Sequence, residues 1–421
     1  MSAGTLIVGA GQAGVQVAAS MRELGYDEPI TIVGAEPHMP YSRPPLSKAL
    51  LAGDAGVAEI ELRTGEYYRD QQIDVIPSLD IVEIDRDSTG AGVATAAGGR
   101  AIRFERLALA TGARPRRLPV PGAELGGVLY LRSVDDALHL RDALAGATRV
   151  VVIGGGFIGL EAASVARKAG KDVVVIEGLE RLVSRSVAPL VSQYLVDVHR
   201  RHGVDVRLGT GVTALHGESG RVSAVELADG TRIDADVVIV GIGIIPNTSL
   251  AERLGLECDR GIVVDLSART SDPRIVAAGD CTVMPNPLTG IGRYGLESTQ
   301  NASSQARTAA ASLLGESSPQ TAAPWFWSDQ YDFKLQIAGL SDGYDSFVVR
   351  GDPSDDAFSV LYYGRDRLLA VDAVGRAADY LAVRAALDRG VHIDAEAARD
   401  PATPLKSLLA ARAPAPSGAE R

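Results

Sequence analysis

The sequence contains little of what several classes of protein require. Only two of its 421 residues are cysteines, Cys258 and Cys281, and they form no C-x-x-C pair, which excludes a disulfide framework and a four-cysteine metal site. The six histidines include no H-E-x-x-H motif, so we expect no protein-bound metal. No apolar run reaches the roughly 18 residues of a membrane-spanning helix. We therefore expect a cytoplasmic protein with no membrane partner.

Positive charge and aromatic residues are also scarce. The chain has 42 Lys and Arg against 53 Asp and Glu, which argues against a nucleic-acid partner because such proteins usually present a basic stripe. Aromatic residues make up only 5%, yet the two tryptophans, Trp325 and Trp327, stand together in "PWFWSDQYD". A chain of this length is expected to form two or three domains.

Glycine, in contrast, marks a strand, turn, helix and strand motif near the N-terminus. The sequence predicts a strand in "TLIVGAG", a helix in "QAGVQVAASMRELG" that ends at Gly25, and a second strand in "ITIVGAE". Gly9, Gly11 and Gly14 form G-x-G-x-x-G at the first turn, where they allow a tight turn, the approach of a pyrophosphate and close packing of helix on strand. In dinucleotide-binding proteins an acidic residue follows such a glycine motif by roughly 20 residues. Glu36 lies a little beyond that distance and can accept hydrogen bonds from a ribose.

The same motif occurs again in "TRVVVIGGGFIGLEAASVARKAGKDVVVIEG", with Gly154, Gly156 and Gly159 in the turn and Glu177 after the second strand. Two complete copies predict two bound dinucleotides. Because a carboxylate repels a 2′-phosphate and accepts from a free 2′-hydroxyl, Glu177 predicts a preference for NADH over NADPH. The nearby arginines downstream of Glu177 leave the strictness of that preference open.

Further motifs carry a resemblance to a known family. A loop with three prolines, "EPHMPYSRPPLSK", is expected to be stiff rather than helical. It is followed by "LALATGARPRRLP", "VVIVGIGIIPNTSLA", "DPRIVAAGDCT" and "AVDAVGRAADY". Together with "WFWSDQYD", these stretches resemble the FAD-dependent NADH:ferredoxin reductases of cytochrome P450 and ring-hydroxylating dioxygenase systems, over nearly the whole chain.

The resemblance implies an α/β fold of glutathione-reductase-like architecture, with two Rossmann-like dinucleotide-binding domains and a C-terminal α+β domain. The FAD-binding domain would comprise residues 1–115 and 249–325, and the NADH-binding domain 116–248. The C-terminal interface domain would cover 326–410, with strands in "SFVVRG", "FSVLYYG" and "RLLAVDAV" and a helix that ends at Gly390. The composition of 411–421 is that of a disordered tail.

The resemblance also assigns cofactor-binding residues. Those expected at FAD are Gly9, Gly11, Gly14, Glu36, Arg43, Lys48, Thr111, Gly112, Gly279, Asp280, Glu297 and Trp327. Those expected at NADH are Gly154, Gly156, Gly159, Glu177 and Gly243.

Three residues are expected in catalytic roles. In similar flavoproteins a lysine and a glutamate at the positions of Lys48 and Glu161 pair near flavin N5, although Lys48 as a solvated loop residue is the alternative. Trp327 is expected between the flavin and a docked [2Fe–2S] ferredoxin, whereas Trp325 is expected as a core anchor. The helix that begins near Leu296, with Glu297 in its first turn, would point at the flavin unless it is an ordinary core helix.

The predicted function is hydride transfer from NADH to FAD, followed by single-electron transfer to a ferredoxin that supplies a P450 or another oxygenase. An NADH oxidase or a disulfide-type reductase of the same fold is the first alternative, but the early segment lacks the cysteine that these enzymes need. Cys281 is instead expected to be buried. An NADH-binding redox sensor that forms a long-lived charge-transfer complex is the second alternative.

Overall fold

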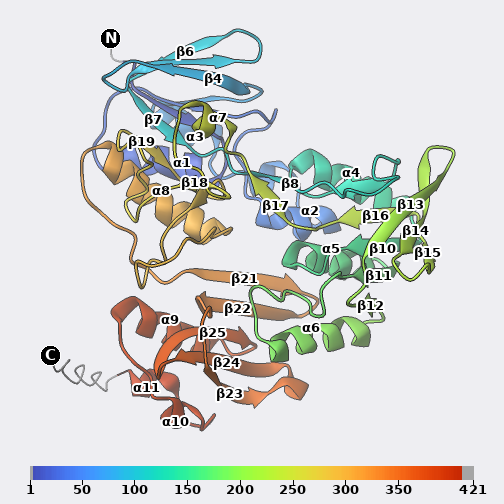
Figure 1. Cartoon of the computed structure of the whole chain (residues 1–421). Helices are drawn as coiled ribbons and strands as arrows, with labels where there is room; N and C mark the ends of the chain where they lie inside the picture. The colour runs from blue at the N-terminus through green and yellow to red at the C-terminus, as the bar shows by residue number, and fades with distance from the viewer. Residues whose placement is uncertain (1–2, 410–421) are drawn as a thin grey trace. The chain divides into compact units, whose positions relative to one another are not determined.

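The computed structural model describes residues 3–409, so the predicted tail at 411–421 lies outside the described residues. The chain divides into two compact units. The first unit comprises residues up to Leu182 together with Val196–Gln320, and the second comprises Val183–Leu195 together with the chain from Thr321 onward. Figure 1 labels the helices and strands of both.

The first compact unit contains two parallel sheets, and the first of them holds the N-terminal glycine turn. Its five strands stand in the order β19-β7-β1-β2-β3. They are β1 (Thr5–Val8), β2 (Ile30–Val33), β3 (Ile73–Ile76), β7 (Arg106–Leu109) and β19 (Ile275–Ala277). With helices α1 (Gln12–Glu23) and α8 (Thr299–Leu313) and the segment 34–72 between β2 and β3, this sheet forms what we call the first half.

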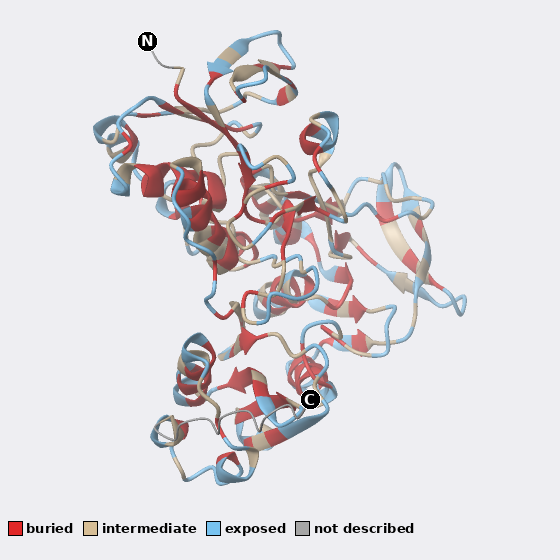
Figure 2. Ribbon diagram, turned by 60° about the vertical axis from the view of Figure 1, so that its left-hand side comes forward, coloured by how far each residue is buried: buried red, intermediate tan, exposed pale blue. Residues whose placement is uncertain are grey.

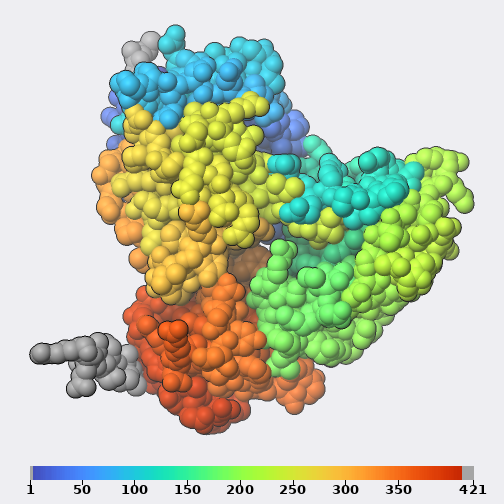
Figure 3. Space-filling view, in the orientation of Figure 1, coloured from blue at the N-terminus to red at the C-terminus, as the bar shows by residue number. Residues whose placement is uncertain are grey.

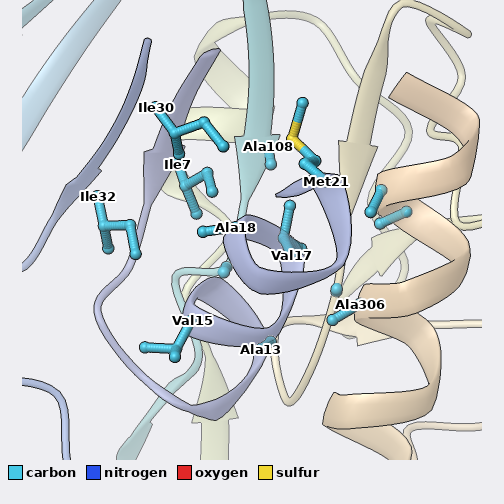
Figure 4. Close-up of a cluster of buried hydrophobic side chains, with 14 of the residues drawn as sticks. Ile7, Ala13, Val15, Val17, Ala18, Met21, Ile30, Ile32, Ala108 and Ala306 are labelled. Atoms are coloured by element: carbon cyan, nitrogen blue, oxygen red, sulfur yellow. The ribbon is translucent and has the colours of Figure 1, made fainter. Parts of the chain in front are cut away.

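Small side chains bring the two helices of the first half together. Val17 and Met21 of α1, Ile7 and Ile30 of the sheet and Ala306 of α8 belong to one buried cluster (Figure 4). A row of alanines in α8 is buried against it, because a methyl side chain lets two helix backbones approach closely. The core thus fixes α1, and with it the turn at its N-terminus.

The second parallel sheet, read from the opposite edge, has a similar order around the second glycine turn, except that its edge strand β9 precedes that turn in sequence. Its strands run β12-β11-β10-β16-β9. They are β9 (Val128–Tyr130), β10 (Arg149–Ile153), β11 (Asp172–Ile176), β12 (Asp205–Arg207) and β16 (Val237–Val240). With helix α5 (Phe157–Lys168) they form the second half. The predicted strand, turn, helix and strand are therefore confirmed in both halves.

Each half also carries a three-stranded antiparallel sheet. One consists of β4 (Ile81–Arg86), β5 (Gly92–Ala96) and β6 (Ala101–Phe104), and the other of β13 (Val212–Glu218), β14 (Arg221–Leu227) and β15 (Arg232–Asp234). Figure 2 shows that the parallel strands are mostly buried. In β13, by contrast, one residue is buried and three are exposed. In Figure 3 the β4–β6 region (light blue) adjoins a later segment (yellow), and Arg86 pairs there with Asp272 at 2.8 Å.

Two short strands connect the halves as an antiparallel ribbon, β8 (Ala113–Pro115) with β17 (Ile244–Pro246). The unit also contains the helix α4 (Val134–Gly146). Its other short elements are η1 (Pro44–Ser47), α2 (Ala49–Ala52), η2 (Ala58–Ile60), α3 (Gly65–Asp70), α7 (Ser249–Arg253), β18 (Ile262–Val263) and β20 (Thr282–Val283). The proline-rich segment was expected to be a non-helical loop, and this prediction was partly wrong. Its two adjacent prolines begin the 3₁₀ turn η1, because proline suits the first positions of a helical turn, where no N–H partner is needed.

The second compact unit is built on a five-stranded antiparallel sheet in the order β21-β22-β25-β24-β23. Its elements are β21 (Trp325–Gln330), β22 (Phe333–Gly339), β23 (Ser346–Asp352), η3 (Pro353–Asp355), β24 (Ala357–Gly364), β25 (Arg367–Val374), α9 (Ala377–Arg389), α10 (Ala395–Ala398) and α11 (Leu405–Leu408). The three predicted strands and the helix ending at Gly390, which adopts a positive φ of 62°, are confirmed.

The segment Val183–Leu195 packs into this second unit, although it lies between strands of the second half in sequence. It includes the start of α6 (Pro189–Arg201). The Ala188 N–H donates to the Tyr362 hydroxyl at 3.1 Å, and this hydroxyl donates to the Asp372 carboxylate. Complete burial raises the pKa of Asp372 to about 7. Within residues 3–409, none of the helices combines the length and the apolar character needed to cross a membrane.

Candidate functional site

The first glycine of each turn is required by the backbone. Gly9 and Gly154 adopt φ values of 124° and 108°. A Cβ atom would lie 2.0 Å from the carbonyl oxygen of Ala110 at the first position, and 2.3 Å from that of Gly241 at the second. Neither position can therefore carry a side chain, so each strand turns directly into its helix.

The other two glycines of each turn differ from each other in the same way in both halves. A Cβ on Gly14 would lie 1.9 Å from the Gly9 oxygen, and one on Gly159 would lie 2.3 Å from the Gly154 oxygen, so these glycines let helix and strand pack closely. In contrast, a Cβ on Gly11 would meet no protein atom within 4 Å. One on Gly156 would meet only the Gly241 oxygen, at 4.0 Å. The middle glycines thus leave room at the N-termini of α1 and α5, where backbone N–H groups suit a pyrophosphate.

Side chains hold the acid of the first half. Arg43 donates to Glu36 at 2.6 Å, and the Tyr41 hydroxyl donates to the other carboxylate oxygen. Arg43 also donates to the Arg132 carbonyl oxygen at 2.5 Å, which ties this loop to the start of α4. Burial raises the pKa of Tyr41, so its hydroxyl remains a proton donor. The two predicted FAD residues Glu36 and Arg43 are therefore brought together.

Backbone groups hold the acid of the second half. Glu177 follows β11 directly, and its carboxylate accepts from the N–H of Gly155 at 2.7 Å and from the N–H of Leu179 at 2.8 Å. The acid therefore lies against the second glycine turn, with Gly154 and Gly156 on either side of its donor.

The structure brings Lys48 and Glu161 together across the two halves. The Lys48 ammonium lies 2.6 Å from Oε2 of Glu161 on α5, and the Ser47 hydroxyl donates to the same oxygen at 2.5 Å. Glu161 is 4% exposed and Ser47 is 5% exposed. A buried carboxylate requires such partners, since an isolated charge in a protein interior is costly.

Hydrogen bonds also join the A-T-G stretch to the returning connection. The Thr111 hydroxyl donates to the Asn247 carbonyl oxygen at 2.6 Å, and the Asn247 side-chain amide donates to the Thr111 oxygen at 2.9 Å. The Asn247 N–H donates to the Gly112 oxygen at 2.9 Å, and Gly243 precedes β17 with a φ of 101°. These contacts reinforce the β8–β17 ribbon between the halves.

Arg132 is a polar residue of this region that sequence reasoning missed. It pairs with Asp280 at 3.0 Å, and its Nε is buried with no hydrogen-bond partner among the described residues. Gly279, next to Asp280, donates its N–H to Gln305 of α8 at 2.8 Å. No local pattern singles out Arg132, because it is one arginine between a strand and a helix cap.

The expected position of Glu297 was wrong. Helix α8 begins at Thr299, and the Ser298 side chain caps it by accepting from the Asn301 N–H at 3.1 Å, so Glu297 is exposed and precedes the first turn. Serine is a strong N-cap, and this preference outweighs an earlier start. In the first turn, Oε1 of Gln300 is buried without a partner among the described residues.

The tryptophans and the cysteine near Asp280 complete the predicted residues. Trp325 and Trp327 lie on one face of β21, with ring centroids 6.0 Å apart. Trp327 donates its Nε1–H to Asp329 at 3.1 Å, and the Arg384 guanidinium lies 4.4 Å from the Trp325 ring. Both indoles are half-buried in the second unit. Cys281 is fully buried, as expected, and burial raises the pKa of its thiol.

Comparison with known proteins places this geometry in a family. The sequence profile "Pyridine nucleotide-disulphide oxidoreductase" matches residues 4–306, and the profile "Reductase C-terminal" matches 325–409. The chain belongs to the pyridine nucleotide-disulphide oxidoreductase family. Within it, rhodocoxin reductase of Rhodococcus erythropolis is 45% identical, with 96% of this chain and 94% of the relative covered. Putidaredoxin reductase of Pseudomonas putida is 42% identical, with 96% of each covered.

Solved structures agree with these relatives. The reductase chain in the covalent complex of putidaredoxin reductase with putidaredoxin superposes with a TM-score of 0.92 at 41% identity, covering 97% of this chain and 98% of that one. A ferredoxin reductase from Rhodopseudomonas palustris also gives a TM-score of 0.92, at 42% identity, covering 96% and 99%. The predicted fold class and resemblance are thus confirmed, because the relatives named here are rhodocoxin, putidaredoxin and ferredoxin reductases.

The family and its ferredoxin–NAD(P)+ reductase members use FAD and NAD(H). The residues of this chain fit both groups. The open space at Gly11 and Gly156 admits a pyrophosphate at each helix N-terminus. The buried Nε of Arg132 and Oε1 of Gln300 are a donor and an acceptor with no protein partner among the described residues, as expected of groups that serve a bound polar ligand.

Proposed function

We propose that this protein is an NADH-dependent ferredoxin reductase located in the cytoplasm. It takes a hydride from NADH and delivers single electrons to a [2Fe–2S] ferredoxin, which supplies a cytochrome P450 or another oxygenase. The observation that carries the proposal is that two glycine turns of the same geometry occur in two halves, and that the Lys48–Glu161 contact joins these halves. Two relatives that match 96% of the chain support the acceptor, since they are named rhodocoxin reductase and ferredoxin–NAD(P)+ reductase.

The first half would hold FAD, in a domain comprising residues 1–115 and 249–325. Its glycine turn would receive the pyrophosphate, Glu36 the adenosine ribose, and Asp280 a ribitol hydroxyl. Arg132 extends the predicted set, because its side chain pairs with Asp280 and its carbonyl binds Arg43. The other residues assigned to this cofactor are Thr111, Gly112 and Gly279. Glu297 is less suited, since it is exposed before the cap of α8.

The second half would hold NADH, in a domain at 116–248. Gly154, Gly156 and Gly159 would receive its pyrophosphate, and Glu177 would accept from the ribose hydroxyls. The ribbon that begins directly after Gly243 would bring the halves toward each other.

Bound FAD supplies the chemistry, since it accepts a hydride from NADH and releases electrons one at a time. The chain's own residues position the cofactors and stabilise the charge that develops on them. Lys48 and Glu161 form a compensated pair of charges where the two halves meet. Such a fixed pair needs no rearrangement when charge develops nearby, which is the main way in which a protein lowers a barrier electrostatically.

The C-terminal domain, at 326–410, would present the ferredoxin-docking surface, with Trp327 as the residue between cofactor and partner. A basic rim would attract an acidic ferredoxin in a salt-dependent manner. The predicted members are Arg63, Arg114, Arg116, Arg117, Lys334 and Arg376. Two of them already have acidic partners, because Lys334 lies 3.3 Å from Asp329 and Arg376 lies 2.7 Å from Asp379.

Anaerobic stopped-flow absorbance tests the proposal in two mixing steps. The purified protein is mixed with NADH while the flavin bands are followed, and the reduced protein is then mixed with an oxidised [2Fe–2S] ferredoxin. Rapid bleaching followed by reoxidation as the ferredoxin is reduced supports the proposal. Bleaching without transfer to any ferredoxin of a panel contradicts it and favours an oxidase or a redox sensor.

The variant Trp327→Ala tests the partner side of the same assay. It is expected to slow ferredoxin reduction about tenfold, consistent with loss of one aromatic anchor at an interface, and to leave reduction by NADH nearly unchanged. Trp325→Ala is the matched control on the same strand. Equal slowing of both electron-transfer steps by Trp327→Ala would remove its assigned role.

A further inference from the structure

Besides the expected lysine, a serine donates to the buried carboxylate oxygen of Glu161. The Ser47 hydroxyl donates to Oε2 at 2.5 Å, and the Lys48 ammonium lies 2.6 Å from the same oxygen. Lys48 also lies 3.5 Å from the Ser47 hydroxyl oxygen and 3.3 Å from the Pro44 carbonyl oxygen. Serine, lysine and glutamate therefore form a closed triangle.

The backbone fixes where the serine stands. Ser47 is the last residue of η1, which begins with two prolines, and Lys48 follows with φ −128° and ψ −108°. The turn therefore holds the serine hydroxyl and the lysine on the same carboxylate. Ser47 is as deeply buried as Glu161, so water does not substitute easily for its hydroxyl.

Both donors come from the first half, and the acceptor comes from helix α5 of the second half. Lys48 alone supplies a charge on a flexible side chain, which can swing about the carboxylate. A short serine side chain on a constrained turn supplies direction, because a second hydrogen bond to the same oxygen fixes the carboxylate in one orientation.

We infer that Ser47 is a positioning residue that orients the Glu161 carboxylate and, through it, the Lys48 ammonium, for the reduction of FAD by NADH. The inference rests on the proposed function for its reaction, and on the structure for its contacts. Ser47 acts through Glu161, to which its hydroxyl donates.

The test is a double-mutant cycle on the full-length, FAD-loaded protein. The four proteins are the wild type, Ser47→Ala, Glu161→Ala and the double variant, and each is reduced by NADH in anaerobic stopped flow. Ser47→Ala is expected to lower the limiting rate about tenfold, with little change in the NADH concentration at half-maximal rate, since a hydrogen bond to a charged group is lost. In the Glu161→Ala background the same substitution is expected to have little further effect. An unchanged rate in Ser47→Ala, or the same slowing in both backgrounds, would overturn the inference.

Ser312→Ala is the matched control. The Ser312 hydroxyl is also buried and donates to the Ser267 carbonyl oxygen at 2.6 Å, but it lies at the C-terminal end of α8. It is expected to keep the wild-type rate of reduction by NADH, and slowing equal to that in Ser47→Ala would assign the effect to general loss of packing.

Urea unfolding of the same four proteins provides a readout that does not depend on activity. Ser47→Ala is expected to lower the unfolding midpoint in the wild type and hardly at all in Glu161→Ala, because the acceptor is then gone. Equal shifts in both backgrounds would show that Ser47 does not act on stability through Glu161, and would overturn the inference. If NADH fails to reduce even the wild type, the proposed function fails, and the unfolding cycle still decides whether Ser47 acts on Glu161.

Discussion

The two halves of the first compact unit are alike in their glycines and differ in the polar residues around them. In each half the first and third glycines are confined by backbone oxygens, and the middle one faces open space. Five residues after the middle glycine, the first half has Gln16 and the second half has Glu161. Gln16 donates to Ser20 of its own helix at 3.0 Å. Glu161 instead accepts from two residues of the other half, Ser47 and Lys48.

The difference shows how one scaffold can serve two tasks. Shape at the turn is determined by backbone geometry, which only glycine permits. Task is determined by the side chains. The neutral amide of Gln16 bonds within α1, whereas the carboxylate of Glu161 in α5 binds Ser47 and Lys48. The acids after the second strands differ similarly, because Glu36 is held by side chains and Glu177 by backbone N–H groups.

The largest effect is expected where the halves are alike. Gly14→Ala and Gly159→Ala should each lower the free energy of unfolding by about 3 kcal/mol, because the new methyl would lie 1.9 Å and 2.3 Å, respectively, from a backbone oxygen. Urea unfolding of the purified proteins measures this loss. Gly146→Ala, where a Cβ meets nothing within 4 Å, should cause none. Wild-type stability in either turn variant would break the equivalence of the two turns.

Lys48→Ala should have the next largest effect on stability, and this effect should differ from that of the corresponding change in the first half. It removes the cation that lies 2.6 Å from Glu161, which is 4% exposed, so the free energy of unfolding should fall by about 3 kcal/mol or slightly less. The corresponding change in the first half, Gln16→Leu, removes one neutral hydrogen bond and should cost about 1 kcal/mol. Equal losses in urea unfolding would show that the charge difference between the helices has no energetic consequence.

The smallest effect concerns cofactor choice. Glu177→Ala should reduce the preference for NADH over NADPH about tenfold, or about 1.4 kcal/mol, because the repulsion of a 2′-phosphate is lost. Steady-state kcat/KM with both nucleotides measures it. Glu36→Ala is the control, since it should weaken retention of FAD and leave that ratio unchanged. A ratio that responds to Glu36 and not to Glu177 would reverse the assignment of the halves.

Local sequence patterns predicted the local structure well. The glycine spacing and the flanking apolar runs located β1, α1 and β2 and their counterparts β10, α5 and β11, because a turn of this kind depends on residues close in sequence. The start of α8 was misplaced by the choice between Glu297 and the better cap Ser298.

Contacts between distant residues could not be predicted from local patterns. Lys48 and Glu161 are separated by 113 positions, and their pairing was expected only from the resemblance to a family. Ser47 and Arg132 were missed because their partners become neighbours only after the two halves have formed. The same holds for Val183–Leu195, whose place in the second unit depends on packing against a sheet formed much later in the chain.

The most direct test of the account is the assignment of one cofactor to each half. Gly11→Ala and Gly156→Ala add a methyl that meets almost no protein, so both proteins should fold, and each should fail only with its own ligand. FAD content by absorbance and reduction by NADH under anaerobic conditions are measured for both. The account predicts that Gly11→Ala loses FAD on dialysis, and that Gly156→Ala retains FAD but requires far more NADH to reduce it. Loss of FAD from Gly156→Ala, with retention in Gly11→Ala, would contradict it.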